Sequence, residues 1–242
     1  MKTLLISHIA DNDGISPVIL LKLVIDDFDY KLLEIYEVEE YMNLFIDSKE
    51  YKKYDRIYFT DLKLSMELCK KIDSIDELKN KLLVFDHHQS NLFANDFDFA
   101  TVVVKNEEGR MECGTSLFYK YLKSKYANSI LDNQIVSNYV ELVRENDTWD
   151  YLIENELIAK KLGMLFSLYN KERYINNMIY NLKNNIVPKT IIKEISDIVS
   201  NEVEDTIKKP EKTITRNQSG YIFSSILKES IFAVKTLLTA KL

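Results

Sequence analysis

The sequence predicts an α/β fold, a parallel sheet of about five strands with flanking helices, followed by a helical region. Three observations support this prediction. Short apolar runs alternate with segments of helical period over the first half of the chain, which is typical of βαβ units with right-handed crossovers. The second half has helical periodicity almost throughout. Hydrophobic residues make up 46% of the 242 positions, which is enough for a folded core and excludes a mostly disordered chain.

The expected strands are short apolar runs that end at polar residues. In chain order they are Thr3–Ile6, Lys31–Tyr36, Arg56–Phe59, Leu82–Phe85 and Thr101–Val104. The helices expected between the first four of them are Ile15–Ile25, Val38–Ser48 and Ser65–Ile72. Pro17 falls in the first turn of the first helix, where proline is tolerated, and Ser65 is a suitable N-cap for the third.

The second half of the chain predicts further helices. We expect them over residues 114–127 and over Asn133–Glu145, and then a largely helical stretch over residues 156–208 that Pro188 interrupts. One strand-like piece, Tyr221–Ser224, follows near the end.

Charge and cysteine content exclude some classes of protein. The 32 basic and 38 acidic residues give a net charge of −6, which disfavours non-specific binding to long duplex nucleic acid. The two cysteines, Cys69 and Cys113, lie far apart, which fits a reducing cytosol. The longest apolar stretch, Pro17–Ile25, contains Lys22 and is too short to span a bilayer. We therefore expect a cytoplasmic protein with no membrane partner, and the sequence leaves a homodimer open.

The three histidines of the chain all follow expected strands and have acidic neighbours. His8 precedes Asp11 and Asp13, and the pair His87-His88 follows Asp86. Parallel strands deliver the residues at their carboxyl ends to one edge of the sheet, where ligands bind. Histidine with carboxylates, and no cysteine nearby, suits divalent metals such as Mn²⁺ or Fe²⁺. The acidic residues taken alone fit ordinary turns and N-caps, but the grouping of all three histidines favours a site.

Four segments together resemble the motifs of the DHH phosphoesterase superfamily, in the family's order and over roughly residues 1–150. They are Ser7-His8-Ile9-Ala10-Asp11-Asn12-Asp13-Gly14, Thr60-Asp61-Leu62, Asp86-His87-His88 and Asp147-Thr148-Trp149. The first and last are most similar to the branch that contains nano-RNases and cyclic-nucleotide phosphodiesterases. The resemblance implies a catalytic domain over residues 1–180.

The resemblance also implies a role for each motif residue. His8 and Asp11 would hold one metal ion, and Asp13, His87 and Asp147 a second, with Asp61 bridging the two. The metals would be two divalent ions, Mn²⁺ in the first place, with Mg²⁺ or Co²⁺ as alternatives. Asp61, His87 and His88 would be catalytic, and His88 would contact the substrate phosphate or assist the leaving group. Asp86 would orient a histidine from behind, the alternative being an exposed side chain at the end of a strand.

Family phosphodiesterases carry a second domain with a glycine-rich motif that binds the substrate. The five glycines here are never adjacent, and no histidine follows His88. We therefore expect residues 181–242 to form a connector helix and a truncated C-terminal substrate-binding module.

Three further features are candidates for substrate contacts. Gly114 and Thr115, which begin a helix after Cys113, could bind a phosphate through backbone N–H groups or simply cap the helix. Arg144 could meet a phosphate, although a surface ion pair with Glu141 is the simpler expectation. We expect Trp149, the only tryptophan, to pack behind the last motif rather than to form a base-stacking surface.

The leading functional hypothesis is a two-metal phosphodiesterase, or exonuclease, that acts on short oligonucleotides or nucleotide-like phosphodiesters. Two alternatives remain open. One is a phosphoanhydride hydrolase of the pyrophosphatase or polyphosphatase kind, and the other is a catalytically impaired protein that binds metal or nucleotide.

Overall fold

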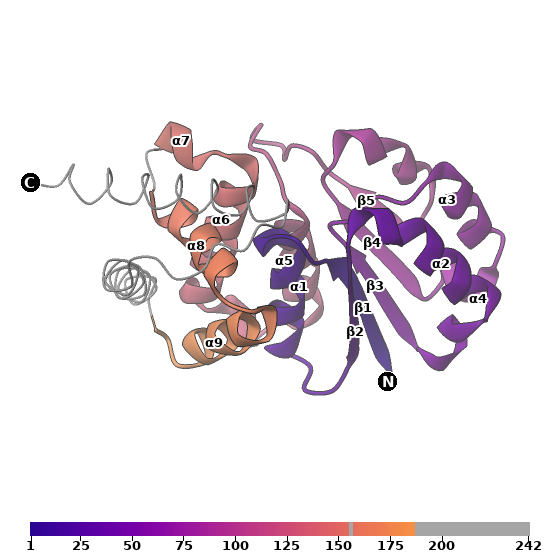
Figure 1. Ribbon diagram of the computed structural model, residues 1–242, viewed down its shortest axis with the longest axis horizontal. Helices are drawn as coiled ribbons and strands as arrows, with labels where there is room; N and C mark the ends of the chain where they lie inside the picture. The colour runs from indigo at the N-terminus through magenta and orange to yellow at the C-terminus, as the bar shows by residue number, and fades with distance from the viewer. Residues whose placement is uncertain (155–156, 187–242) are drawn as a thin grey trace, which may run out of the picture. The chain divides into compact units, whose positions relative to one another are not determined.

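Five parallel strands form the central sheet, in the order β2-β1-β3-β4-β5 (Figure 1). The strands are β1 (Thr3–His8), β2 (Asp29–Leu33), β3 (Arg56–Thr60), β4 (Leu82–Asp86) and β5 (Ala100–Val102). The computed structural model describes residues 1–154 and 157–186, all of which belong to one unit, Met1–Ile192. The predicted fold class is confirmed over these residues. The chain leaves β1 toward β2 and returns past it to β3, so the order of the strands reverses between β1 and β3.

Helices cover both faces of the sheet (Figure 1). On one face lie α2 (Val38–Asp47), α3 (Met66–Asp73) and α4 (Asp76–Lys79). On the other, α1 (Asn12–Lys22) and α5 (Gly114–Lys125) pack on the strands. Farther from the sheet on this side are α6 (Gln134–Thr148), α7 (Tyr151–Glu154), α8 (Leu157–Leu168) and α9 (Lys171–Lys183). Short 3-10 turns span Ile35–Glu37, Glu50–Lys53, Gln89–Asp96 and Ile130–Asp132.

The alternation of side chains along β3 shows how the sheet divides the core. Ile57 and Phe59 face the α2 and α3 side, where they join a cluster of buried apolar residues. Tyr58 faces the opposite side and meets Phe118 of α5, with ring centroids 5.0 Å apart. Both faces are buried, as a parallel sheet requires, and α1 and α5 are therefore fixed directly against the strands that carry the site.

Several predicted boundaries shift because capping and strand pairing decide them. Asp11 accepts a hydrogen bond from the backbone of Gly14, so α1 begins at Asn12 rather than at Ile15. Pairing with β1 runs from Asp29 to Leu33, so β2 begins two residues before the expected strand Lys31–Tyr36 and ends three residues before its end. The helical run expected from residue 156 breaks at Asn170, which caps α9.

Parts of the prediction fall outside the described residues. These include the interruption at Pro188, the strand Tyr221–Ser224 and most of the C-terminal module. In the described part of the chain, every helix is too short or too polar to cross a bilayer.

Candidate metal centre

The carboxyl ends of β1, β3 and β4 bring the polar motif residues together at one edge of the sheet. His8 is the last residue of β1, Asp61 follows β3, and His87 and His88 follow β4. The position is the point where strand order reverses, which is where open α/β sheets bind ligands. Helix α6 adds Asp147 from its last turn.

The first cluster consists of His8, Asp11 and Asp61. One potential ligand atom from each lies within 4.8 Å of the others. His8 Nδ1 is 3.3 Å from Asp11 Oδ2 and 3.5 Å from Asp61 Oδ2. Asp11 is the most exposed of the three, so the cluster opens to solvent on that side.

The second cluster consists of Asp13, His87 and Asp147, again with ligand atoms within 4.8 Å of one another. His87 Nε2 lies 3.6 Å from Asp13 Oδ2, and His87 Nδ1 lies 3.6 Å from Asp147 Oδ2. The structure therefore brings together all six residues expected to hold metals.

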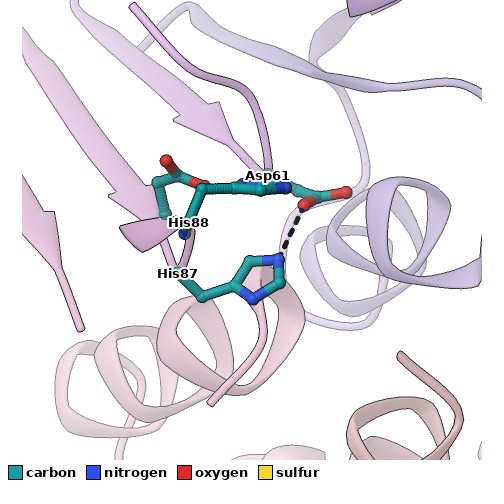
Figure 2. Close-up of side chains that lie close together, drawn as sticks. Asp61, His87 and His88 are labelled. Carbon is teal, nitrogen blue, oxygen red and sulfur yellow. Dashed lines mark hydrogen bonds and ion pairs between the residues drawn. The ribbon is translucent and has the colours of Figure 1, made fainter. Parts of the chain in front are cut away.

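Asp61 joins the two clusters. Its Oδ2 faces His8, and its Oδ1 lies 3.3 Å from His87 Nε2, an approach that Figure 2 shows as a dashed line. The side chain is 3% exposed, and Oδ2 is buried without a hydrogen-bond partner. A buried carboxylate oxygen without a donor is costly unless a cation satisfies it. These residues therefore fit a pair of divalent cations, since imidazole and carboxylate are ligands that such ions accept.

The backbone of Asp61 is also unusual, because its φ is 53°. Left-handed backbone is uncommon for residues other than glycine, although aspartate and asparagine tolerate it best. The Asp61 N–H donates to the Phe85 carbonyl oxygen at 3.0 Å, which ties this turn to the end of β4. The turn directs the carboxylate between the two histidines.

Both clustered histidines hold protons strongly when no metal is bound. The close carboxylates of Asp11 and Asp61 raise the pKa of His8 to about 10. Burial lowers the pKa of His87, but the hydrogen bond to Asp61 and the surrounding carboxylate charges outweigh it and raise that pKa to about 10.

The pKa values of the two carboxyl groups in the second cluster are raised as well. Burial, then the charges of Asp61 and Asp147, raise the pKa of Asp13 well above its ordinary value. Burial and the neighbouring acids Asp61 and Asp11 raise the pKa of Asp147 to about 6, against the opposing effect of His87. The metal-free site is a crowded set of acids that protons partly neutralise, and divalent cations would replace those protons.

Gly114 and Thr115 contact Asp13 rather than offering free N–H groups for a phosphate. The Gly114 N–H donates to Asp13 Oδ2 and the Thr115 N–H to Asp13 Oδ1, each at 2.7 Å. The Thr115 hydroxyl also donates to the Asp13 carbonyl oxygen at 2.7 Å. A protein carboxylate therefore occupies the helix N-terminus, which favours the capping alternative, and a phosphate contact by Gly114 and Thr115 stays a prediction. The helix is also capped, with the Cys113 sulfur accepting from the Ser116 N–H at 3.4 Å.

Two glycines, Gly14 and Gly114, allow backbone segments to approach closely at the site, and this role was not predicted from the sequence. A Cβ at Gly114 would lie 2.7 Å from the Cβ of Asp61, and a Cβ at Gly14 would lie 2.2 Å from the His8 carbonyl oxygen. A larger side chain at either position would therefore push a helix away from the residues that it supports. The signal was available in the glycine in the first turn of each helix, but the contact between Gly114 and Asp61 is long-range.

Asp86 is fully buried, so the alternative of an exposed side chain at the end of a strand is wrong. Its Oδ1 pairs with His88 Nδ1 at 2.7 Å, and Oδ2 accepts from Asn91 Nδ2 at 2.6 Å. The hydrogen bond to Asp86 raises the pKa of His88. The His88 side chain is 46% exposed, so it lies at the solvent side of the site. Sequence reasoning missed Asn91, whose buried amide completes this arrangement.

Arg144 forms the expected ion pair with Glu141, at 2.7 Å, but it lies in the interior and not on the surface. The side chain is 4% exposed and also donates to Asp150 and, at 3.1 Å, to the Met111 carbonyl oxygen. These partners occupy the guanidinium, so the expected role in substrate binding is not supported. The packed position expected for Trp149 is wrong, because the side chain is 63% exposed.

Comparison with known proteins identifies a distant homologue. The chain is 28% identical over 180 residues to oligoribonuclease NrnB of Bacillus subtilis (strain 168). The match covers 74% of this chain and 44% of NrnB, so the chain spans less than half of that relative's length. No protein-family model matches.

The fold also has a counterpart among solved structures. A crystal structure of an uncharacterized protein from Helicobacter pylori G27 superposes with a TM-score of 0.60 and 18% sequence identity. The match covers 82% of this chain and 62% of the other. At this identity the likeness shows a shared fold alone.

Proposed function

We propose that this protein is a metal-dependent phosphodiesterase of the DHH phosphoesterase superfamily that hydrolyses short oligonucleotides. The observation that carries the proposal is the pair of histidine and carboxylate clusters that Asp61 joins. Distant homology to a protein named an oligoribonuclease supports the choice of substrate.

In this proposal, each cluster holds one divalent ion. His8 and Asp11 would bind the first, Asp13, His87 and Asp147 the second, and Asp61 both. Mn²⁺ suits this donor set, and Mg²⁺ or Co²⁺ are alternatives. Two such ions, when bound, supply a water activated for attack on phosphorus and neutralise charge on the phosphoryl oxygens.

The protein's own residues fix the geometry of this centre. The N-terminus of α5 holds both oxygens of Asp13, so that carboxylate cannot rotate when a metal binds. Asp86 engages Nδ1 of His88, which leaves Nε2 as the ring nitrogen able to donate to a phosphate or leaving-group oxygen. The raised pKa of His88 favours the protonated form that such a donor needs.

A substrate panel with the full chain and Mn²⁺ tests the function. We expect release of mononucleotides from the dinucleotide pApA, and slower turnover of a cyclic dinucleotide and of pyrophosphate. Asp61→Asn should abolish turnover while leaving the fold intact, because asparagine tolerates the left-handed backbone at this position. Asp98→Asn, an exposed carboxylate before β5, is the matched control and should remain active.

Two outcomes would contradict the proposal. Preferential hydrolysis of pyrophosphate would indicate a phosphoanhydride hydrolase. Metal binding without turnover of any of the three substrates would indicate a binding protein.

A further inference from the structure

We infer that the exposed indole of Trp149 is a stacking surface for a base of the bound substrate. This inference rests on the proposed function and extends it, because it makes the base, and not only the phosphodiester, part of what the site recognises.

The backbone at Trp149 is in a conformation that large side chains rarely adopt. Trp149 ends α6 with φ 64° and ψ 15°, a position that usually takes glycine or asparagine. A bulky residue there costs free energy that burial of its side chain could offset. Here the side chain is 63% exposed, so burial does not offset that cost in the described part of the structure. The fold alone gives no reason to place tryptophan at this position.

The segment around Trp149 is nevertheless held firmly from both sides. The buried Arg144 guanidinium donates to Asp150, and the Thr148 hydroxyl donates to the Arg144 carbonyl oxygen at 2.9 Å. The Trp149 carbonyl oxygen accepts from the Leu152 N–H at 3.1 Å. The buried Tyr151 ring lies near the indole, with centroids 6.5 Å apart and planes inclined by 25°. An aromatic side chain on a backbone held in this way has few rotatable bonds to immobilise when a second ring stacks on it.

The position of Trp149 indicates what would stack there. It stands two residues after Asp147 of the second cluster, and two residues of chain reach at most about 7 Å. In a nucleotide, a single sugar joins the phosphate to its base. A substrate whose phosphate sits on the metal cluster therefore carries a base within reach of this part of the chain. Aromatic side chains are the usual platforms for unpaired bases, and they accept any base because every base has a π face.

Intrinsic fluorescence gives a direct measurement, because Trp149 is the only tryptophan in the chain. With Mg²⁺ bound, we expect AMP to quench the emission saturably and ribose 5-phosphate, which lacks a base, to leave it unchanged. Acrylamide should quench the emission of the free protein, as an exposed indole requires. Equal effects of AMP and ribose 5-phosphate, or an indole that acrylamide cannot reach, would overturn the inference.

A kinetic cycle provides the second readout. Trp149→Ala should raise KM for pApA about tenfold or more, with a smaller effect on kcat, and Trp149→Phe should restore part of the loss. Trp149→Ala should change KM little when the substrate is a dinucleotide analogue that lacks the stacked base. Removing the base and removing the indole delete the same interaction, so their effects should not add.

Leu152→Ala is the matched control. This neighbouring side chain is 64% exposed. If Trp149 affected KM only by packing against another segment of polypeptide, either substitution should change KM. If Trp149 stacks on a base, only its own substitution should do so. Equal effects of the two substitutions on KM would overturn the inference. If pApA is cleaved but AMP does not quench the Trp149 emission, the stacking inference is wrong and the proposed function stands. If pApA is not cleaved and neither nucleotide nor sugar phosphate binds, the proposed function fails as well.

Discussion

Replacing Gly114 with alanine adds one methyl group at the contact between α5 and Asp61 of the candidate metal centre. The new Cβ would lie 2.7 Å from the Asp61 Cβ and 3.0 Å from its Cα and N. Ordinary contact begins near 3.4 Å, so the two groups must separate by about 0.7 Å.

Neither side of this contact can yield freely. The Asp61 N–H donates a hydrogen bond to the Phe85 carbonyl oxygen, and the Gly114 N–H donates one to Asp13 Oδ2. Any separation therefore displaces Asp61, Asp13 or both. A misplacement of about 1 Å can lower a rate by about 10²-fold, and overpacking costs about 1–3 kcal/mol of stability. We expect Gly114→Ala to lose about 10–100-fold in kcat on pApA and to weaken Mn²⁺ binding, with a loss of stability within that range.

The assay compares kcat, Mn²⁺ affinity and the metal-free Tm of Gly114→Ala with those of Gly109→Ala. A Cβ at Gly109 meets nothing within 4 Å, but φ there is 82°, so alanine strains the backbone without moving the site. The control should therefore lose stability and keep its activity. The reasoning is refuted if Gly114→Ala keeps kcat within about twofold of the wild type, or if Gly109→Ala loses as much.

Three further predictions follow from the site and its supports. Folding raises the pKa values of His8 and His87 from 6.5 to about 10. The two protonated imidazoles therefore contribute fully to the stability of the metal-free protein below pH 6.5, and this contribution to the free energy of unfolding is lost as the pH rises toward 10. The metal-free Tm should fall across that window, and bound Mn²⁺ should reduce the fall; a Tm that rises with pH in the metal-free protein would contradict this. Asp86→Asn should lower kcat about 10–100-fold and lower the pKa of His88, with Mn²⁺ affinity nearly unchanged, which pH–rate profiles and metal titration would measure. Arg144→Met should cost about 1–3 kcal/mol in denaturant unfolding, because it removes the Arg144 donor from Asp150 and leaves Glu141 with Arg110 alone. An unchanged midpoint would show that the ion pairs of Arg144 contribute nothing.

The residues of the site were predictable because a simple rule places them. Polar residues at the ends of parallel strands meet at one edge, and this rule alone brings His8, Asp61 and His87 together. The partner of the α5 N-terminus could not be predicted in this way. Asp13 stands 101 positions before Gly114, and no local pattern reports a hydrogen bond across that separation.

The same distinction explains the other errors. The helical period of α6 predicts which of its residues face the core, but Trp149 follows the helix in a left-handed turn that the period does not describe. Charged residues are expected at the surface, and only the folded structure shows that Asp150 and the Met111 carbonyl draw Arg144 inside.

The contact between Asp13 and the start of α5 also bears on how the protein is made. At roughly 5–20 residues per second, a ribosome adds Gly114 several seconds after Asp13, and Asp147 later still. The emerging chain therefore contains His8 and Asp13 well before Gly114, whose N–H group holds the Asp13 carboxylate in place. Under the proposed function, metal capture should accordingly be a late event in biogenesis, after synthesis of most of the unit.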